Sequence, residues 1–465
     1  MVNQEFDVLV IGAGPAGATA ALRASALGAR VALVDKRRTG GTCTNTGCVP
    51  TRVLAITARL LRDIRGAGAY GIEVSAPQLE WKTTVAKVRQ VIAEIQNVKR
   101  VQDKLRDAGG QLFLEGAAHF LDPHRVKLAD SGRELSAKNI ILCVGGKARR
   151  PPIPGVEFAI TPEEIVDLEH LPKSVVIVGS GYTGVQVTTI MSAYGANVTL
   201  LETAPNILPP ADADVARALR DGFERQGVRV ITGISGIQGI KLEPDGLKRL
   251  TYTFQDVQHS INVEAVILAV GWPAALEGLG LEQIGLETER GFVKINSYLQ
   301  TNLDHIFVAG DANGRDMLVQ GANFEAEVAA ENAVRGATLE FDRHSLPSGG
   351  FTDPDHAGVG VQEAQARDEG MDCVVAVARY SDLERAIIDS RTAGFLKLIA
   401  DKTGRIIGAN GTGENAVEVM QAVATAMAAG ATAATLAGVR FAYPTYTAII
   451  GEAARKLVKQ FEARA

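Results

Sequence analysis

The chain has 465 residues, more than one hydrophobic core normally organises, so we expect about three domains. Its 48 basic and 53 acidic residues give a net charge of −5 without long runs of like charge, which argues against nucleic acid or an anionic membrane as a partner. Four cysteines in so long a chain do not form a secreted disulfide framework and are compatible with a reducing cytoplasm.

Neither a leader nor a membrane span is predicted. The first strand begins near Phe6, which leaves no room ahead of it for a signal peptide. The stretch from Met420 to Val439 is uncharged but rich in Ala, Thr and Gly, so it predicts a packed helix and a turn instead of a membrane span. We therefore expect a cytoplasmic protein.

The first recognisable unit runs from Phe6 to Asp35. The letters FDVLVIGAGPAGATAALRASALGARVALVD predict a strand, a glycine-rich turn, a helix and a second strand that ends at the acid. This order is the fingerprint of a βαβ dinucleotide-binding unit, in which the phosphates lie at the helix N-terminus. The residues expected to bind the nucleotide are Gly12, Gly14, Gly17 and Asp35.

A pair of cysteines follows directly, in the stretch GGTCTNTGCVP. Cys43 and Cys48 are separated by four residues, too many for a thioredoxin-type CxxC. With no second pair or histidine cluster nearby, the spacing does not suit zinc either, so no metal site is predicted. A pair of thiols beside a nucleotide site predicts a redox pair; the alternative is two unrelated buried cysteines.

The same βαβ pattern recurs in SVVIVGSGYTGVQVTTIMSAYGANVTLLE. The first glycine precedes the acid by 23 positions in both copies, Gly12 to Asp35 and Gly179 to Glu202, which chance does not readily produce twice. Two copies imply two nucleotide sites. A third signal is HIFVAGDAN, where a short apolar strand runs into Gly310 and Asp311 at its carboxyl end, the place where open α/β sheets bind ligands.

The segments between these units predict the domain boundaries. NIILCVGG and PPIPG look like a strand and a rigid crossover, VEAVILAVGWP like the return, and the chain after about Ser345 like an antiparallel sheet followed by helices. We expect a first domain of residues 1–155 and 270–344, a second of residues 156–269, and a third of residues 345–465. The predicted fold class is α/β, with two Rossmann-like domains and a C-terminal α+β domain.

The ordered motifs IGAGPAG, GGTCTNTGCVP, VGSGYTG, AGDAN, FTDP, GFLK and YPT resemble those of the FAD-dependent pyridine nucleotide-disulfide oxidoreductases, the class I flavoprotein disulfide reductases. The resemblance covers nearly the whole chain. It implies that electrons pass from a nicotinamide to FAD, then to a Cys43–Cys48 disulfide, and then to an acceptor. By the same resemblance Cys48 is the charge-transfer thiolate beside the flavin, and Cys43 the exposed thiol that meets the substrate.

The resemblance also assigns the cofactor residues. Glu202 suits the free ribose hydroxyl of NAD and repels a 2′-phosphate, so NADH is preferred over NADPH, although acceptance of both is the alternative. Tyr182 resembles the tyrosine that covers the nicotinamide pocket, or is a packed aromatic. The predicted FAD residues are Gly12, Gly14, Gly17, Asp35, Thr42, Arg52, Gly145, Gly310 and Asp311. The predicted NAD residues are Gly179, Gly181, Tyr182, Gly184, Gln186, Glu202 and Gly271.

The chain departs from the family pattern in its C-terminal segment, FAYPTYTAIIGE. Tyr443 and Ala448 stand where disulfide-reducing members carry a His–Glu acid–base pair, and a tyrosine there resembles mercuric reductases. Arg52 and Gln186 replace a Lys and a Glu that pair near the flavin. The chain ends without a cysteine pair for metal delivery. We therefore expect a homodimeric, mercuric-reductase-like enzyme, with Tyr443 in its site, acting on a metal ion or a small electrophile.

Two alternatives remain open at this point. One is a dihydrolipoamide- or glutathione-type disulfide reductase in which water, Glu452 or Tyr446 replaces the missing pair. The other is a non-catalytic redox sensor.

Overall fold

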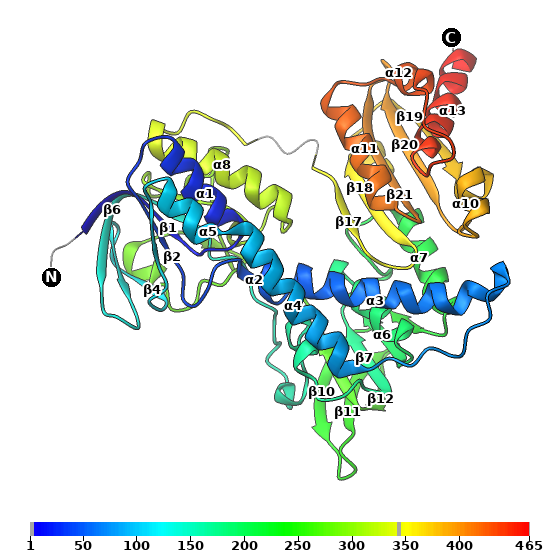
Figure 1. Ribbon diagram of the computed structural model, residues 1–465, viewed down its shortest axis with the longest axis horizontal. Helices are drawn as coiled ribbons and strands as arrows, with labels where there is room; N and C mark the ends of the chain where they lie inside the picture. The colour runs from blue at the N-terminus through cyan, green and yellow to red at the C-terminus, as the bar shows by residue number, and fades with distance from the viewer. Residues whose placement is uncertain (1–3, 342–345, 465) are drawn as a thin grey trace. The chain divides into compact units, whose positions relative to one another are not determined.

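A computed structural model describes residues 4–341 and 346–464 of the chain (Figure 1). The chain forms two compact units, each with its own sheets and core. The first comprises residues 1–53, 82–149 and 271–343, and the second residues 54–81, 150–270 and 344–465.

The first unit is built on a seven-stranded sheet. Three strands, β3, β2 and β1, run parallel, and β6 continues the parallel part on the other side of β1. β16 also pairs with β6, while β5 and β4 add an antiparallel edge. The strands are β1 (Gln4–Ile11), β2 (Val31–Val34), β3 (Gln111–Phe113), β4 (Ala118–Asp122), β5 (Arg125–Leu128), β6 (Glu134–Leu142) and β16 (Ile306–Val308).

Strand β1 is apolar on both faces because both faces are covered. Leu9 and Ile11 pack into one core with Ile140, whereas Val8 and Val10 pack into another, formed against helices on the opposite face. Helices α1 and α8 lie side by side on that second face (Figure 1). The helices of this unit are α1 (Pro15–Ala26), α2 (Gly41–Asn45), α4 (Trp81–Lys99), α5 (Val101–Asp107) and α8 (Val319–Arg335), with the short hairpin β14 (Thr288–Glu289) and β15 (Phe292–Val293).

Helix α3 (Cys48–Gly66) begins in the residues of the first unit and continues in those of the second. The second unit contains the repeated βαβ pattern as a four-stranded parallel sheet in the order β13-β7-β8-β9. A three-stranded antiparallel sheet, β10-β11-β12, contributes Ile240, Leu250 and Tyr252 to the same core. The elements are β7 (Ser174–Val178), α6 (Tyr182–Ala193), β8 (Asn197–Glu202), α7 (Ala213–Arg225), β9 (Arg229–Thr232), β10 (Gly236–Leu242), β11 (Lys248–Phe254), β12 (Val257–Val263) and β13 (Ala265–Leu268).

The C-terminal part of the second unit is a five-stranded antiparallel sheet in the order β17-β18-β21-β20-β19, packed against helices. The uncharged stretch from Met420 to Val439 falls in α11, a turn and α12, as predicted. The elements are β17 (Ser348–Gly350), β18 (Asp355–Gly360), α9 (Glu363–Asp368), β19 (Cys373–Arg379), α10 (Glu384–Ile388), β20 (Phe395–Asp401), β21 (Ile406–Gly413), α11 (Ala416–Ala428), α12 (Ala433–Gly438) and α13 (Ala448–Arg464).

The α/β fold class, with two dinucleotide-binding βαβ patterns and a C-terminal α+β part, is confirmed. Among the described residues, no helix is both long enough and apolar enough to cross a bilayer. The division into three domains by residue number stays a prediction.

Candidate functional site

The two glycine-rich turns have the same backbone geometry. Gly12 and Gly179 directly follow strands β1 and β7 at φ +102° and +94°, where an added Cβ would lie 2.3 Å from the carbonyl oxygen of Cys143 and 2.4 Å from that of Ala269. A Cβ on Gly17 or Gly184 would come within 2 Å of the carbonyl oxygen of the first glycine of its own turn. Only glycine fits these positions, so both turns bring the helix N-terminus close to the strand end.

The acids at the ends of the second strands also correspond. Asp35 accepts a hydrogen bond from the backbone N–H of Ala13 at 2.7 Å, and Glu202 accepts one from Ser180 N–H at 2.7 Å. Each acid accepts a second bond from the residue two positions on, Arg37 N–H at 3.1 Å and Ala204 N–H at 2.8 Å. The carboxylates are thus held beside the turns, as ribose-binding acids would need to be.

Glu202 accepts two further hydrogen bonds, both from side-chain hydroxyls. The hydroxyls of Ser180 and Thr203 donate to it at 2.6 and 3.1 Å. Burial opposes ionisation of this acid, but the bonds from Ala204, Ser180 and Thr203 outweigh it and lower its pKa. The residue is 8% exposed and carries its charge at neutral pH.

These features fit the two cofactors that the sequence predicts. Each turn leaves room for a pyrophosphate at the N-terminus of a twelve-residue helix, α1 or α6, and places a charged carboxylate at the adjoining strand end. In the first unit, Gly41 also approaches Gly14 so closely that a Cβ would lie 2.7 Å from its Cα, which keeps the backbone of the cysteine segment against the turn. Both turns therefore suit a dinucleotide, and the assignment of FAD to the first and of the nicotinamide to the second stays a prediction.

The two predicted redox cysteines are adjacent. Cys43 lies in α2 and is half-buried, and Cys48 is the exposed first residue of α3. The carbonyl of Thr42 accepts hydrogen bonds from Thr46 N–H at 2.9 Å and Gly47 N–H at 2.7 Å, and so closes the turn between them. The two side chains are within hydrogen-bond reach of each other, with the Cys48 thiol donating to Cys43 Sγ.

That hydrogen bond decides which thiol ionises first. The bond from Cys48, together with the positive charge of Lys99, lowers the pKa of Cys43 to about 7, against the opposing effects of burial and Asp311. The same contact and burial raise the pKa of Cys48. Cys43 is therefore the thiol of the pair that ionises more readily, as a nucleophile or a metal-binding thiolate requires. The role of Cys48 as the flavin-side thiolate stays a prediction.

The loop after β16 holds Gly310 and Asp311. Its support is Glu325 on α8, which is fully buried and accepts bonds from Gly310 N–H at 2.7 Å and Asn313 Nδ2 at 2.8 Å. Burial raises the pKa of Glu325 to about 7, and burial also raises the pKa of Asp311. No sequence motif predicts this role of Glu325, because the role depends on the packing of α8 against the loop.

The remaining predicted residues are divided between the two units, and Gly271, predicted to bind NAD, falls in the first unit and not with the second turn. Arg52 is half-buried on α3, one turn after Cys48. Gly145 and Gly271 belong to the first unit, where their carbonyls accept bonds from Ala275 N–H and Arg149 N–H. Gln186 belongs to the second unit, where its amide donates to the carbonyl of Tyr182 at 2.9 Å and accepts from Phe351 N–H at 3.4 Å.

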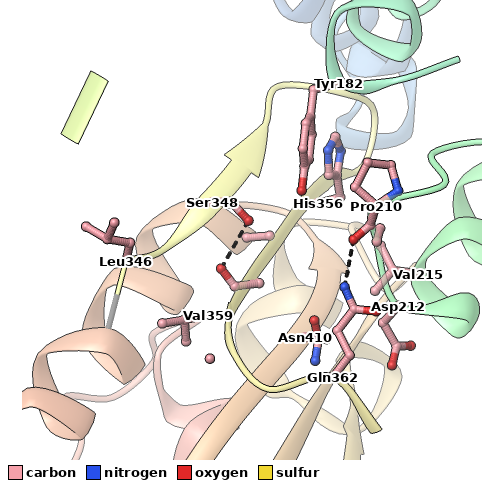
Figure 2. A pocket seen from close by; sticks show the side chains of 14 residues that line it. Tyr182, Pro210, Asp212, Val215, Leu346, Ser348, His356, Val359, Gln362 and Asn410 are labelled. Carbon is pink, nitrogen blue, oxygen red and sulfur yellow. Dashed lines mark hydrogen bonds between the residues drawn. The ribbon is translucent and has the colours of Figure 1, made fainter. Parts of the chain in front are cut away.

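Tyr182, at the start of α6, borders a pocket of the second unit. Its ring lies parallel to that of His356 on β18, with centroids 5.8 Å apart (Figure 2). The hydroxyl of Thr352 donates to Pro354 O, so its oxygen accepts from His356 Nδ1–H at 2.9 Å. His356 Nε2 therefore carries the lone pair, and it has no partner among the described residues. Burial lowers the pKa of His356 to about 4.

The C-terminal segment contains Tyr443, the predicted site residue, and Tyr446 and Glu452, the two candidate substitutes for the missing acid–base pair. The Tyr443 ring is 78% exposed. Tyr446 is buried and donates its hydroxyl to Asp389 at 2.8 Å, and burial and that contact raise its pKa to about 12. Glu452 forms an ion pair with Arg455 on the exposed face of α13. The Tyr446 hydroxyl is thus engaged by Asp389, and the Glu452 carboxylate by Arg455.

Among the residues with described coordinates, no three His, Cys, Asp or Glu side chains gather into a group that could hold a metal ion.

Comparison with known proteins gives relatives of several activities. The chain is 33% identical to a dihydrolipoyl dehydrogenase of Haloferax volcanii, over 98% of this chain and 96% of that protein. It is 30% identical to a glutathione reductase of Nostoc sp., covering 92% and 95% of the two chains. It is 29% identical to a mercuric reductase of Bacillus cereus, covering 92% of this chain and 68% of that protein.

Among solved structures, the chain resembles the Cu(II) complex of the HOCl-induced flavoprotein disulfide reductase RclA from Escherichia coli. The TM-score is 0.85 at 25% identity, over 98% of this chain and all of that one. Residues 6–326 match the family model for pyridine nucleotide-disulphide oxidoreductases, and residues 346–454 match the dimerisation domain of the same family. With both family domains present, its cofactors are FAD and NAD(P)H, and the chain belongs to the pyridine nucleotide-disulphide oxidoreductases.

Proposed function

We propose that this oxidoreductase passes electrons from NADH through FAD and the Cys43–Cys48 pair to a metal ion, in the manner of a mercuric reductase. When bound, FAD supplies the chemistry of accepting a hydride equivalent from the nicotinamide and releasing two electrons. The protein binds and orients the cofactors through the two glycine turns and through Asp35 and Glu202. Cys43 presents a soft thiolate ligand to the acceptor.

The observation that carries this proposal is the state of the C-terminal segment. Reduction of an organic disulfide releases a thiolate that needs a positioned proton donor, whereas reduction of a metal ion releases no such group. The Tyr446 hydroxyl donates a hydrogen bond to Asp389, and Glu452 forms an ion pair with Arg455. Tyr443 is exposed and lies in the same segment. The names of two similar proteins, a mercuric reductase and the copper(II) complex of a flavoprotein disulfide reductase, agree with a metal-ion acceptor.

A second candidate is disulfide reduction with oxidised lipoamide or glutathione. The observation in its favour is that relatives covering 92% or more of this chain are named dihydrolipoyl dehydrogenase and glutathione reductase. This candidate requires a proton source other than Tyr446 or Glu452, such as water. A cofactor-binding redox sensor is the remaining possibility.

The test is anaerobic reduction of the holoprotein with NADH, followed by rapid mixing with Hg(II), Cu(II), oxidised lipoamide or oxidised glutathione while flavin absorbance is recorded. We expect rapid reoxidation by the metal ions, and loss of this reaction in Cys43→Ser. Rapid reoxidation by a disulfide and not by metal would overturn the proposal in favour of the second candidate. No reoxidation by any of the four would favour the sensor.

We also propose that the protein works as a homodimer, with Tyr443 at the site of the partner. The C-terminal part matches the family's dimerisation domain, and apolar side chains are exposed in the same unit. Ile56, Leu60 and Ile64 recur every four residues along one face of α3 and are 41%, 57% and 37% exposed. Exposed apolar stripes of this kind mark interaction surfaces. A cytoplasmic location stays a prediction from the cysteine usage.

A further inference from the structure

A pocket of the second unit contains two buried polar atoms that lack a partner. Its lining comes from the N-terminus of α6, the segment before α7 and strands β17, β18 and β21 (Figure 2). His356 Nε2 and Asn410 Nδ2 have no hydrogen-bond partner among the described residues, and both side chains line the pocket. The two residues are only 2% and 5% exposed. Because unpaired polar atoms are costly when buried, their presence beside a cavity indicates that a bound molecule pairs with them.

The register of the sheet places the two side chains on one face. Across β18 and β21, His356 is opposite Thr412 and Gly358 is opposite Asn410. His356 and Asn410 are therefore diagonal neighbours, which lie about 7–8 Å apart on the same face of a sheet. A Cβ on Gly358 would come 2.8 Å from Asn410 Oδ1, so this glycine leaves room for the amide. A single small molecule can contact both side chains.

The two unpaired atoms have opposite hydrogen-bonding character. Thr352 donates its hydroxyl to Pro354 O at 2.6 Å, so its oxygen accepts from His356 Nδ1–H at 2.9 Å. His356 Nε2 is consequently an acceptor, whereas Asn410 Nδ2 carries two N–H donors. A molecule that satisfies both needs an N–H group and a carbonyl oxygen side by side, which is the arrangement in a primary amide.

Other polar side chains of the lining already have partners. Ser348 Oγ donates to Gly358 O at 3.3 Å, and Gln362 Nε2 donates to Pro210 O at 2.6 Å (Figure 2). These groups close the wall of the pocket and leave the ligand to be selected by His356 and Asn410.

The charge that Asp212 brings to the lining is compensated. Its carboxylate accepts two hydrogen bonds from Lys397 Nζ, both at 3.1 Å. The pair belongs to a balanced cluster of three carboxylates and three basic groups, namely Asp212, Asp214, Glu363, Lys397, Arg217 and Arg367. A charged ligand would find no free counter-charge here and would lose its hydration, so the pocket favours a neutral one.

We propose that this pocket is a binding site for a small neutral amide, which donates an N–H to His356 Nε2 and accepts a hydrogen bond from Asn410 Nδ2. The cavity has a volume of about 90 Å³. Since one water needs about 10–15 Å³ of such space, the cavity has room for about six non-hydrogen atoms. Val215 and Val359 in the lining provide apolar contacts for a short alkyl group. This site is separate from the cysteine pair and does not depend on the proposed electron acceptor.

The probe is isobutyramide, a primary amide of the size of the cavity. Its isomer N,N-dimethylacetamide keeps the carbonyl group but has no N–H, and isobutyrate has the same shape but is an anion. Binding is followed in the holoprotein labelled with nitrogen-15 histidine, in which His356→Phe identifies the His356 resonances. We expect isobutyramide to shift the Nε2 resonance of His356 saturably. The other two compounds should bind at least about tenfold more weakly, because each leaves a buried group unpaired.

Two variants test the donor. Asn410→Leu keeps most of the side-chain volume and removes the amide, so isobutyramide should bind about tenfold more weakly. Asn262→Leu, at an exposed position on β12, is the matched control and should leave the affinity unchanged. The absence of any shift would overturn the proposal, because water alone would then fill the pocket. Equal affinities for the three compounds would also overturn it, and this comparison decides even if Asn410→Leu does not fold.

Tyr182 lines the pocket and also belongs to the second glycine turn, so the titration is repeated with an excess of NAD+. Isobutyramide binding that persists would support a separate site. Its loss would overturn the proposal, because the pocket would then be part of the dinucleotide site. No electron transfer enters this measurement. Failure of the amide site would leave the metal-reductase proposal standing, and reduction of disulfides instead of metal ions would leave the amide site standing.

Discussion

The buried acid Glu325 should make the stability of the protein fall as the pH rises. Its side chain is fully buried on α8, and Oε1 has no hydrogen-bond partner among the described residues. Burial is the largest cause of its raised pKa, from 4.5 to about 7, and the bonds from Gly310 and Asn313 offset only part of it.

The sign and size follow from proton linkage. Between pH 4.5 and 7 the folded protein keeps a proton on Glu325 that the unfolded chain releases, so the free energy of unfolding decreases through this window and levels off above it. At about 1.4 kcal/mol for each unit of pKa, the total cost is about 3 kcal/mol. Glu325→Gln keeps an oxygen acceptor for Gly310 N–H and stays neutral, so it should escape this cost.

The assay compares urea unfolding of Glu325→Gln and the parent holoprotein at pH 5 and pH 8. The difference in unfolding free energy should shift by about 2–3 kcal/mol in favour of the variant at the higher pH. Glu327→Gln, an exposed acid on the same helix, is the control and should show no such shift. Infrared difference spectra of the protonated carboxyl group provide a direct titration with a midpoint near 7. A midpoint near 4.5, or a variant effect independent of pH, would refute the reasoning.

Three further outcomes are expected. Burial lowers the pKa of His356 to about 4, so His356 should have the opposite effect on stability. Its contribution to the free energy of unfolding is fully present above pH 6.5 and decreases by up to about 3 kcal/mol as the pH falls to 4. His356→Leu should abolish this dependence in acid unfolding measurements. Glu202→Gln should reduce the preference for NADH over NADPH by about tenfold in kcat/KM, since it removes the charge that repels a 2′-phosphate; an unchanged ratio would show that the carboxylate does not sense the ribose. Leu60→Glu, at a 57% exposed position, should leave the fold intact but weaken the dimer in sedimentation velocity experiments; a dimer of unaltered affinity would exclude the α3 stripe from the interface.

The two nucleotide-binding patterns could be predicted from the sequence because they depend on short-range geometry. A strand, a glycine turn and a helix place the acid of the next strand at a set distance, and Asp35 and Glu202 both meet the turn they were expected to meet. The fold class and the cofactors, FAD and a nicotinamide dinucleotide, were predicted from the ordered motifs and the family that they resemble, and both are confirmed. The pairing of Cys43 with Cys48 is local as well, because one turn separates them.

Other features depend on which residues distant in sequence come together, and no spacing rule predicts them. Lys99 reaches Thr44 across 55 positions, and Tyr446 reaches Asp389 across 57. From the sequence alone, Tyr446 is a candidate substitute proton donor. Only the packing of the C-terminal part shows that its hydroxyl is hydrogen-bonded to Asp389. The charge state of Glu325 and the tautomer of His356 are likewise set by burial and by hydrogen-bond partners. The sequence motifs thus determined the fold and the cofactors, whereas tertiary packing decided the electrostatics of the site, because desolvation and charge act between groups that only the folded chain brings together.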